Sequence, residues 1–85
     1  MAANQEDSSL AHKPVGFRGT ISPSNGAEVP RRLRELGFVP GTEVSVLRRG
    51  PLGDPLELEL RGYRICLRRA DLTEVRVDPV SEPDS

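Results

Sequence analysis

The chain has 85 residues, with thirteen acidic and twelve basic side chains and a formal net charge of −1. This length allows one domain with a small core, and excludes a second domain. A single cysteine, Cys66, excludes an internal disulfide, which favours a reducing cytoplasm. Residues 1–9 lack the basic start and apolar run of a secretion signal, and no apolar stretch is long enough to span a bilayer. We therefore expect a cytoplasmic protein that does not insert into the membrane.

The charges are unevenly distributed along the chain. Residues 15–77 hold eleven arginines against eight acidic residues, a balance of +3, whereas the two ends are acidic. Residues 1–13 are polar without any hydrophobic period, and residues 79–85 are acidic and contain two prolines. Such compositions are typical of disordered segments. We predict two disordered tails, 1–13 and 79–85, around one folded domain over residues 14–78.

The first patterned segment predicts a β-strand. Val15, Phe17 and Ile21 alternate with small or polar residues, as expected for a strand with one buried face. The turn-forming residues 22–26 then interrupt this pattern.

A short helix is expected next. Pro30 suits the first turn of a helix because it has no amide hydrogen to satisfy, and Gly37 can adopt the left-handed conformation that ends one at Leu36. Phe38 can then fold back onto Leu33. Its apolar stripe has helical spacing: Val29, Leu33 and Leu36.

From Thr42 onwards the sequence indicates hairpins. Pro40-Gly41 fits the centre of a type II turn. Val44 and Val46 share one face of a strand that leads through Arg48 and Arg49 into a loop, Gly50-Pro51-Leu52-Gly53-Asp54-Pro55. Beyond the loop, alternating apolar residues predict a hairpin about Gly62, with these side chains inside: Leu56, Leu58, Leu60, Tyr63, Ile65 and Leu67.

The last strand follows a break at residues 69–71 and turns Val75 and Val77 inward. About five short antiparallel strands are too few for a two-sheet sandwich, and rolling them into a barrel removes most exposed edges. The predicted fold class is therefore mainly β: a small SH3-like barrel of about five antiparallel strands, with one short α-helix between strands one and two.

At this point the sequence resembles the FeoA proteins of bacterial ferrous iron uptake, and the FeoA-like domain of diphtheria-toxin-repressor-type metalloregulators. The resemblance covers about three quarters of the chain and departs from the family at Leu72, where alanine is usual. It rests on five segments in order: Arg32-Leu33-Arg34-Glu35-Leu36-Gly37, Pro40-Gly41-Thr42-Glu43-Val44, Pro51-Leu52-Gly53-Asp54-Pro55, Arg61-Gly62-Tyr63 and Leu67-Arg68-Arg69.

The resemblance implies a small cytoplasmic accessory protein of ferrous iron transport. Such a protein would bind and regulate the transporter FeoB at its cytoplasmic GTPase domain. The resemblance leaves open whether the protein activates, inhibits or assembles FeoB, and whether the protein forms a homodimer.

The residues themselves argue against catalysis. The one histidine, His12, lies in a predicted tail, so no Ser-His-Asp or Cys-His arrangement can form within the fold. Gly50-Pro51-Leu52-Gly53 lacks the lysine of a phosphate-binding loop. We expect no enzyme activity and no cofactor.

Metal ligands are sparse in the sequence. The pattern predicts that Cys66 is a small hydrophobic residue on one strand. It predicts that Glu57 and Glu59 lie on the solvent-exposed face of another strand. We expect no tight metal site, while weak transition-metal binding involving Asp54 or these glutamates stays open.

The candidate partner-binding site is the loop with its two preceding arginines. Leu52 is an apolar residue at an expected barrel rim, where it either folds over the core or meets a partner. Pro51 and Pro55 stiffen the loop and lower the ordering cost of binding. The predicted contact residues are Arg48, Arg49, Gly50, Pro51, Leu52, Gly53 and Asp54.

Two alternatives to a FeoB-binding module were weighed. A nucleic-acid-binding barrel could use the arginines, but Phe17, Phe38 and Tyr63 all occupy predicted core positions, which leaves no aromatic platform for bases. We therefore expect no nucleic-acid partner. The second alternative is a stand-alone interaction domain derived from an iron-dependent metalloregulator. That role would need a DNA-binding helix-turn-helix region, and this chain has no space for one.

Overall fold

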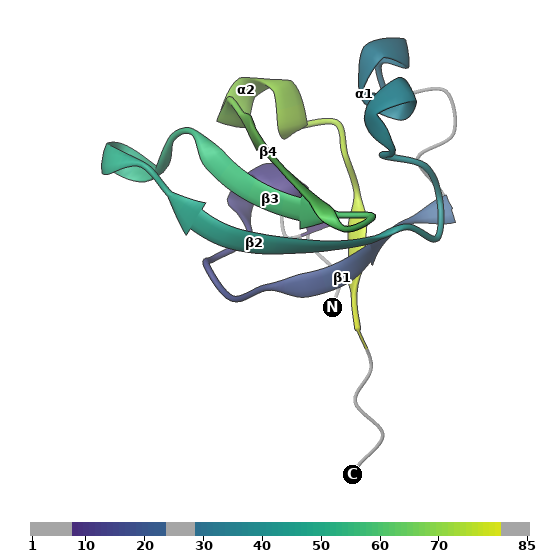
Figure 1. The fold of residues 1–85 in the computed structure, drawn as a ribbon, viewed down its shortest axis with the longest axis horizontal. Coiled ribbons are helices and arrows are strands. Elements are labelled where there is room, and N and C mark those ends of the chain that lie inside the picture. The colour runs from purple at the N-terminus through teal and green to yellow at the C-terminus, as the bar shows by residue number, and fades with distance from the viewer. Residues whose placement is uncertain (1–7, 24–28, 81–85) are drawn as a thin grey trace, which may run out of the picture.

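The computed structural model describes residues 8–23 and 29–80, and the predicted turn residues 24–26 and the outer parts of both predicted tails lie outside these ranges. Figure 1 shows a twisted sheet with two short helices above it. The main elements are β1 (Arg18–Ile21), α1 (Arg31–Leu36), β2 (Glu43–Arg49), β3 (Leu56–Leu60), β4 (Tyr63–Leu67), α2 (Arg69–Leu72) and β5 (Val77–Pro79). The described residues also contain the 3-10 turns η2 (Leu10–His12) and η4 (Pro51–Gly53).

All five strands belong to one antiparallel sheet in the order β4-β3-β2-β1-β5. The expected mainly β class, its five strands and the helix between strands one and two are confirmed. The second helix, α2, was not predicted, because the sequence indicated only a break there. Strand β2 also carries a register shift between Val46 and Arg48, which bends it before the loop.

One cluster of buried side chains forms the core. It collects side chains from the strands, from α1 and α2, and from the segment that precedes β1. Leu72, where the sequence departs from its family resemblance, is fully buried in α2. The other buried apolar residues are Leu10, Ala11, Ile21, Val29, Leu33, Phe38, Val44, Val46, Leu56, Leu58, Leu60, Val75 and Val77.

The helix and its following turn form as the sequence predicts. Gly37 ends α1 with φ 117°, and the amide of Phe38 donates to the carbonyl of Leu33 at 3.1 Å. Gly41 takes φ 89°, and the amide of Thr42 donates to the carbonyl of Val39 at 3.1 Å, which closes the turn about Pro40-Gly41.

The N-terminal segment differs from the expected tail. Leu10 and Ala11 are fully buried, and the amide of Leu10 donates to the carbonyl of Val75 at 2.8 Å. The Ser9 hydroxyl donates to the carbonyl of Thr73 at 3.1 Å, and Ser9 forms a β-bridge with Arg76. Residues 9–12 are therefore part of the domain, because burial of Leu10 and satisfied backbone groups offset the cost of ordering them.

The C-terminal boundary also lies later than predicted. Pro79 belongs to β5 and pairs with Gly19, and the amide of Val80 donates to the carbonyl of Arg18 at 3.1 Å. Residues 79 and 80 are therefore part of the domain, and the rest of the predicted tail lies outside the described residues.

Three apolar or aromatic side chains are less buried than predicted. Val15 lies in a turn before β1 and is 56% exposed, and Phe17 is half-buried beneath the Lys13 ammonium group, which sits 5.1 Å from the ring centroid. Tyr63 is 39% exposed, because β4 is the edge strand, and its hydroxyl donates to the carbonyl of Leu36. The prediction that all three aromatic residues lie in the core was therefore wrong for Tyr63.

Candidate partner-binding site

The β2–β3 loop is a compact structure held by its own backbone. The amide of Gly53 donates to the carbonyl of Gly50 at 2.9 Å, and the amide of Gly50 donates to the carbonyl of Pro55 at 2.9 Å. A side chain at position 50 would come within 2.5 Å of the Asp54 carbonyl oxygen, so glycine is required there. The loop projects at one end of the sheet, on the left of Figure 1. The end of the loop around Leu52, called the tip below, therefore has a fixed conformation before any partner binds.

Leu52 stands at this tip, and its side chain points into solvent. It is 96% exposed, so it does not fold back over the core. Its φ is 63°, in the left-handed region that a leucine adopts only at a conformational cost. No burial within this chain compensates that cost.

Asp54 has a structural role at the base of the loop. One carboxylate oxygen accepts the backbone amide of Arg69 at 2.8 Å, at the start of α2, and the other lies 4.0 Å from Nε of Arg68. A carboxylate in this position satisfies an otherwise unpaired amide and complements the dipole of the helix. Asp54 therefore joins the loop to α2.

The two arginines before the loop have different environments. The Arg48 side chain is 76% exposed and its Nε lies 3.4 Å from a carboxylate oxygen of Glu57. The Arg49 guanidinium instead turns back along the chain and donates to three backbone carbonyls. Its acceptors are Gly53 at 3.1 Å, Ala11 at 2.9 Å, and Lys13. Arg49 therefore connects the loop to the N-terminal segment, and Arg48 is the one that faces solvent.

Replacing these arginines by methionine should separate their roles. Arg49→Met should destabilise the domain by about 2 kcal/mol, because it removes the donors to three carbonyls while keeping the apolar stem. Arg48→Met is the matched control and should cost under about 1 kcal/mol, as expected of an exposed ion pair. Urea unfolding followed by circular dichroism measures both, and equal losses would contradict this assignment.

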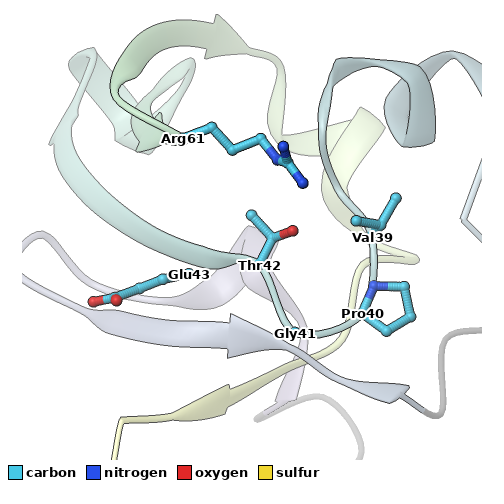
Figure 2. Close-up of a pocket in the computed structure, with 6 residues that line it drawn as sticks. All are labelled: Val39, Pro40, Gly41, Thr42, Glu43 and Arg61. Carbon is cyan, nitrogen blue, oxygen red and sulfur yellow. The ribbon is translucent and has the colours of Figure 1, made fainter.

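A second surface lies at the other end of the sheet, between the Pro40-Gly41 turn and the β3–β4 turn. Figure 2 shows Arg61 extending over a hollow toward Thr42 and Val39. Arg61 also borders a neighbouring hollow beside Leu36 and Tyr63. Sequence reasoning missed this surface, although the two-residue turn at Arg61-Gly62 could have placed Arg61 at a rim.

Two features are absent from residues 8–23 and 29–80, the ranges that the structure describes. No group of three or more His, Cys, Asp or Glu side chains in these ranges is arranged to hold a metal ion. Within the same ranges, none of the helices has both the length and the apolar character needed to cross a membrane. Cys66 lies on a strand, β4, as predicted, but it is exposed.

Comparison with known proteins identifies the family. The model of the FeoA domain matches residues 9–79. Over 73 residues, or 85% of its length, the chain is 35% identical to an Fe(2+) transport protein A/Fe(2+) transporter FeoB fusion protein of Porphyromonas gingivalis. It spans only 9% of that fusion protein.

Solved structures agree with this match. An FeoA-like protein from Clostridium acetobutylicum has a TM-score of 0.75 at 27% identity, with 91% of each chain covered. FeoA from Chlorobium tepidum has a TM-score of 0.72 at 32% identity, covering 89% of this chain and 73% of that one.

A third relative carries a description of its fold. FeoA of Stenotrophomonas maltophilia, solved in complex with zinc and described as a prokaryotic SH3 domain protein, has a TM-score of 0.66 at 33% identity over 82% of this chain and 88% of that one. The SH3-like class predicted from the hairpin pattern is thereby confirmed. With its matched residues running from Ser9 through β5, this chain belongs to the FeoA family of ferrous iron transport accessory domains.

Proposed function

We propose that this chain is a cytoplasmic, non-enzymatic accessory protein that binds the GTPase domain of FeoB through the tip of its β2–β3 loop. The observation that carries this proposal is Leu52, an apolar side chain held 96% exposed on a compact loop. The contact surface consists of Leu52 with the solvent-facing Arg48, while Arg49 and Asp54 hold the loop in place.

The conformation of Leu52 supports a binding role. A left-handed leucine costs about 1 kcal/mol relative to glycine or asparagine at the same position, and the exposed side chain gains almost nothing from burial. Folding of this chain alone therefore does not account for leucine here. Insertion of the side chain into an apolar pocket of a partner would recover the transfer free energy that the free protein forgoes.

The family supports FeoB as the partner. In the Porphyromonas gingivalis relative, an FeoA-type segment and a FeoB transporter form a single chain. Covalent fusion raises the effective concentration of one module near the other, which favours pairs that act together. A stiff loop also loses little entropy on docking.

The direct test is an NMR titration of labelled protein with the FeoB GTPase domain from the same genome, in GDP and GTP-analogue forms. Shifts confined to residues 48–54 are expected, and a preference for one nucleotide state would give the direction of regulation. Absence of shifts at hundreds of micromolar GTPase domain would contradict the proposal.

Substitution at the tip separates binding from stability. Leu52→Asn should raise the free energy of unfolding by about 0.5 to 1 kcal/mol, because asparagine tolerates positive φ, and should abolish GTPase-domain binding. Leu52→Met is the matched control: it retains an apolar side chain and should retain binding. Paired urea melts and titrations measure both quantities, and full binding by Leu52→Asn would remove the tip from the interface.

A further inference from the structure

Strand β4 has an open edge. It is the first strand of the sheet order, and within residues 8–23 and 29–80 it pairs only with β3. Among the residues that the structure describes, no backbone hydrogen bond from a loop or turn reaches the outer side of β4. Its central residues Arg64 and Cys66 are exposed. An edge of this kind is a template for another strand.

The register shows which backbone groups are free. Leu60 and Tyr63 flank the two-residue turn Arg61-Gly62, where φ is 53° and 83°, so these flanking residues form a hydrogen-bonded pair. Hydrogen-bonded and non-hydrogen-bonded pairs alternate along an antiparallel ladder. The amide and carbonyl groups of Arg64 and Cys66 therefore point outward, away from β3.

The two faces of this edge differ in chemistry. On the inner face, Ile65 and Leu67 are only half-buried, although they pack against the core. On the outer face, Arg64 stands beside Cys66, and its terminal nitrogen lies 3.9 Å from a carboxylate oxygen of Glu57. The strand itself contains no acidic residue and is followed directly by Arg68 and Arg69, while its cross-strand neighbours on β3 include Glu57 and Glu59.

We propose that the β4 edge binds an extended peptide segment with alternating acidic and aliphatic residues, which adds as a sixth strand. Its backbone would pair with Arg64 and Cys66, the geometry of strand-addition recognition. Its aliphatic residues would cover the exposed parts of Ile65 and Leu67. Its carboxylates would lie on the outer face beside Arg64, because opposite charges on neighbouring strands attract.

A second copy of this chain fits the edge less well. Pairing β4 with the β4 of another copy would bring Arg64, and Arg68 just beyond the strand, from both copies to one seam without an acidic residue from either strand. Like charges at adjacent positions across strands are destabilising. Charge complementarity therefore favours an acidic segment of another protein. This inference does not depend on the role of the Leu52 loop.

The test uses capped synthetic peptides and the labelled full chain. A peptide of sequence Ser-Glu-Val-Glu-Val-Ser should shift the NMR amide signals of Arg64 and Cys66 and leave the signals of residues 51–53 unchanged. The matched basic peptide, Ser-Lys-Val-Lys-Val-Ser, should bind at least about fivefold more weakly. Equal affinity for the two peptides, or no shifts at millimolar concentration, would overturn the proposal.

Two changes test the backbone pairing. Cys66→Pro removes an outward amide that β3 does not use, so the fold should persist while peptide binding is lost. Cys66→Ser, the control, keeps the amide and should bind as the unmodified chain does. N-methylation of alternate peptide bonds makes the same test without altering the protein. One of the two methylation registers must abolish binding, and retention in both would overturn strand addition.

Discussion

Leu10→Ala should destabilise this domain by about 3 kcal/mol, which corresponds to a fall in melting temperature of about 15 °C for a domain of this size. Leu10 is fully buried and belongs to the core. Its replacement removes apolar contacts and leaves a cavity in the core next to helix α2, and the surrounding side chains relax only partly. Thermal unfolding followed by circular dichroism measures the effect.

The chain supplies its own control for this substitution. Leu52→Ala removes the same atoms from a side chain that is 96% exposed, and should change stability by no more than about 0.5 kcal/mol. If Leu10→Ala were as mild as Leu52→Ala, residues 9–12 would be a dispensable tail, as their composition suggested.

Gly19→Ala should have an effect of similar size through the opposite mechanism, overpacking. A Cβ atom at position 19 would lie 2.3 Å from the Asp78 carbonyl oxygen and 2.5 Å from a ring carbon of Phe17. The ring can turn aside, but the carbonyl belongs to β5, whose residues pair with β1. We expect a loss of about 3 kcal/mol as β5 is pushed from β1.

Thr20→Ala serves as the control, because it shortens the next side chain of the same strand without adding an atom. It should cost under about 1 kcal/mol in urea unfolding. NMR of Gly19→Ala should show its largest shifts in Val77, Asp78 and Pro79. Stability equal to that of Thr20→Ala would mean that β1 and β5 are less closely packed than the structure shows.

Local patterns in the sequence were sufficient for most of the fold. The end of α1 at Gly37, the turn at Pro40-Gly41 and the alternation in Leu56–Leu60 each depend on neighbouring residues, so they could be predicted. The buried pair Leu10-Ala11 could not, because two apolar residues show no period. Its burial depends on helix α2 and on Val75, far along the chain.

Tyr63 shows a different limit of sequence patterns. Alternation assigns Tyr63 to the same face of β4 as Ile65, but it cannot show that β4 is an edge strand. Exposure of an inner-face residue depends on strand order. That order follows from long-range pairing, which periodicity does not report.

The position of the β2–β3 loop could be predicted from the sequence, but the separate roles of its residues could not. Glycine and proline residues mark the loop at positions 50–55, yet nothing in the sequence distinguishes Arg48 from Arg49. The acceptors of Arg49 include carbonyls of Ala11 and Lys13, which lie in a segment distant in the sequence. Outward projection of Leu52 likewise depends on its positive φ, which the residue type disfavours.

Because Arg49 connects the loop to the carbonyls of Ala11 and Lys13, the N-terminal segment should report whether the loop is occupied. A partner bound to the loop suppresses local unfolding of the loop. By linkage it also suppresses local unfolding of the N-terminal segment, which is hydrogen-bonded to Arg49. The Lys13 amide, which donates to the Leu10 carbonyl at 3.2 Å, should then exchange its hydrogen with solvent more slowly. Docking at one end of the β2–β3 loop would thus be readable in a segment that need not touch the partner.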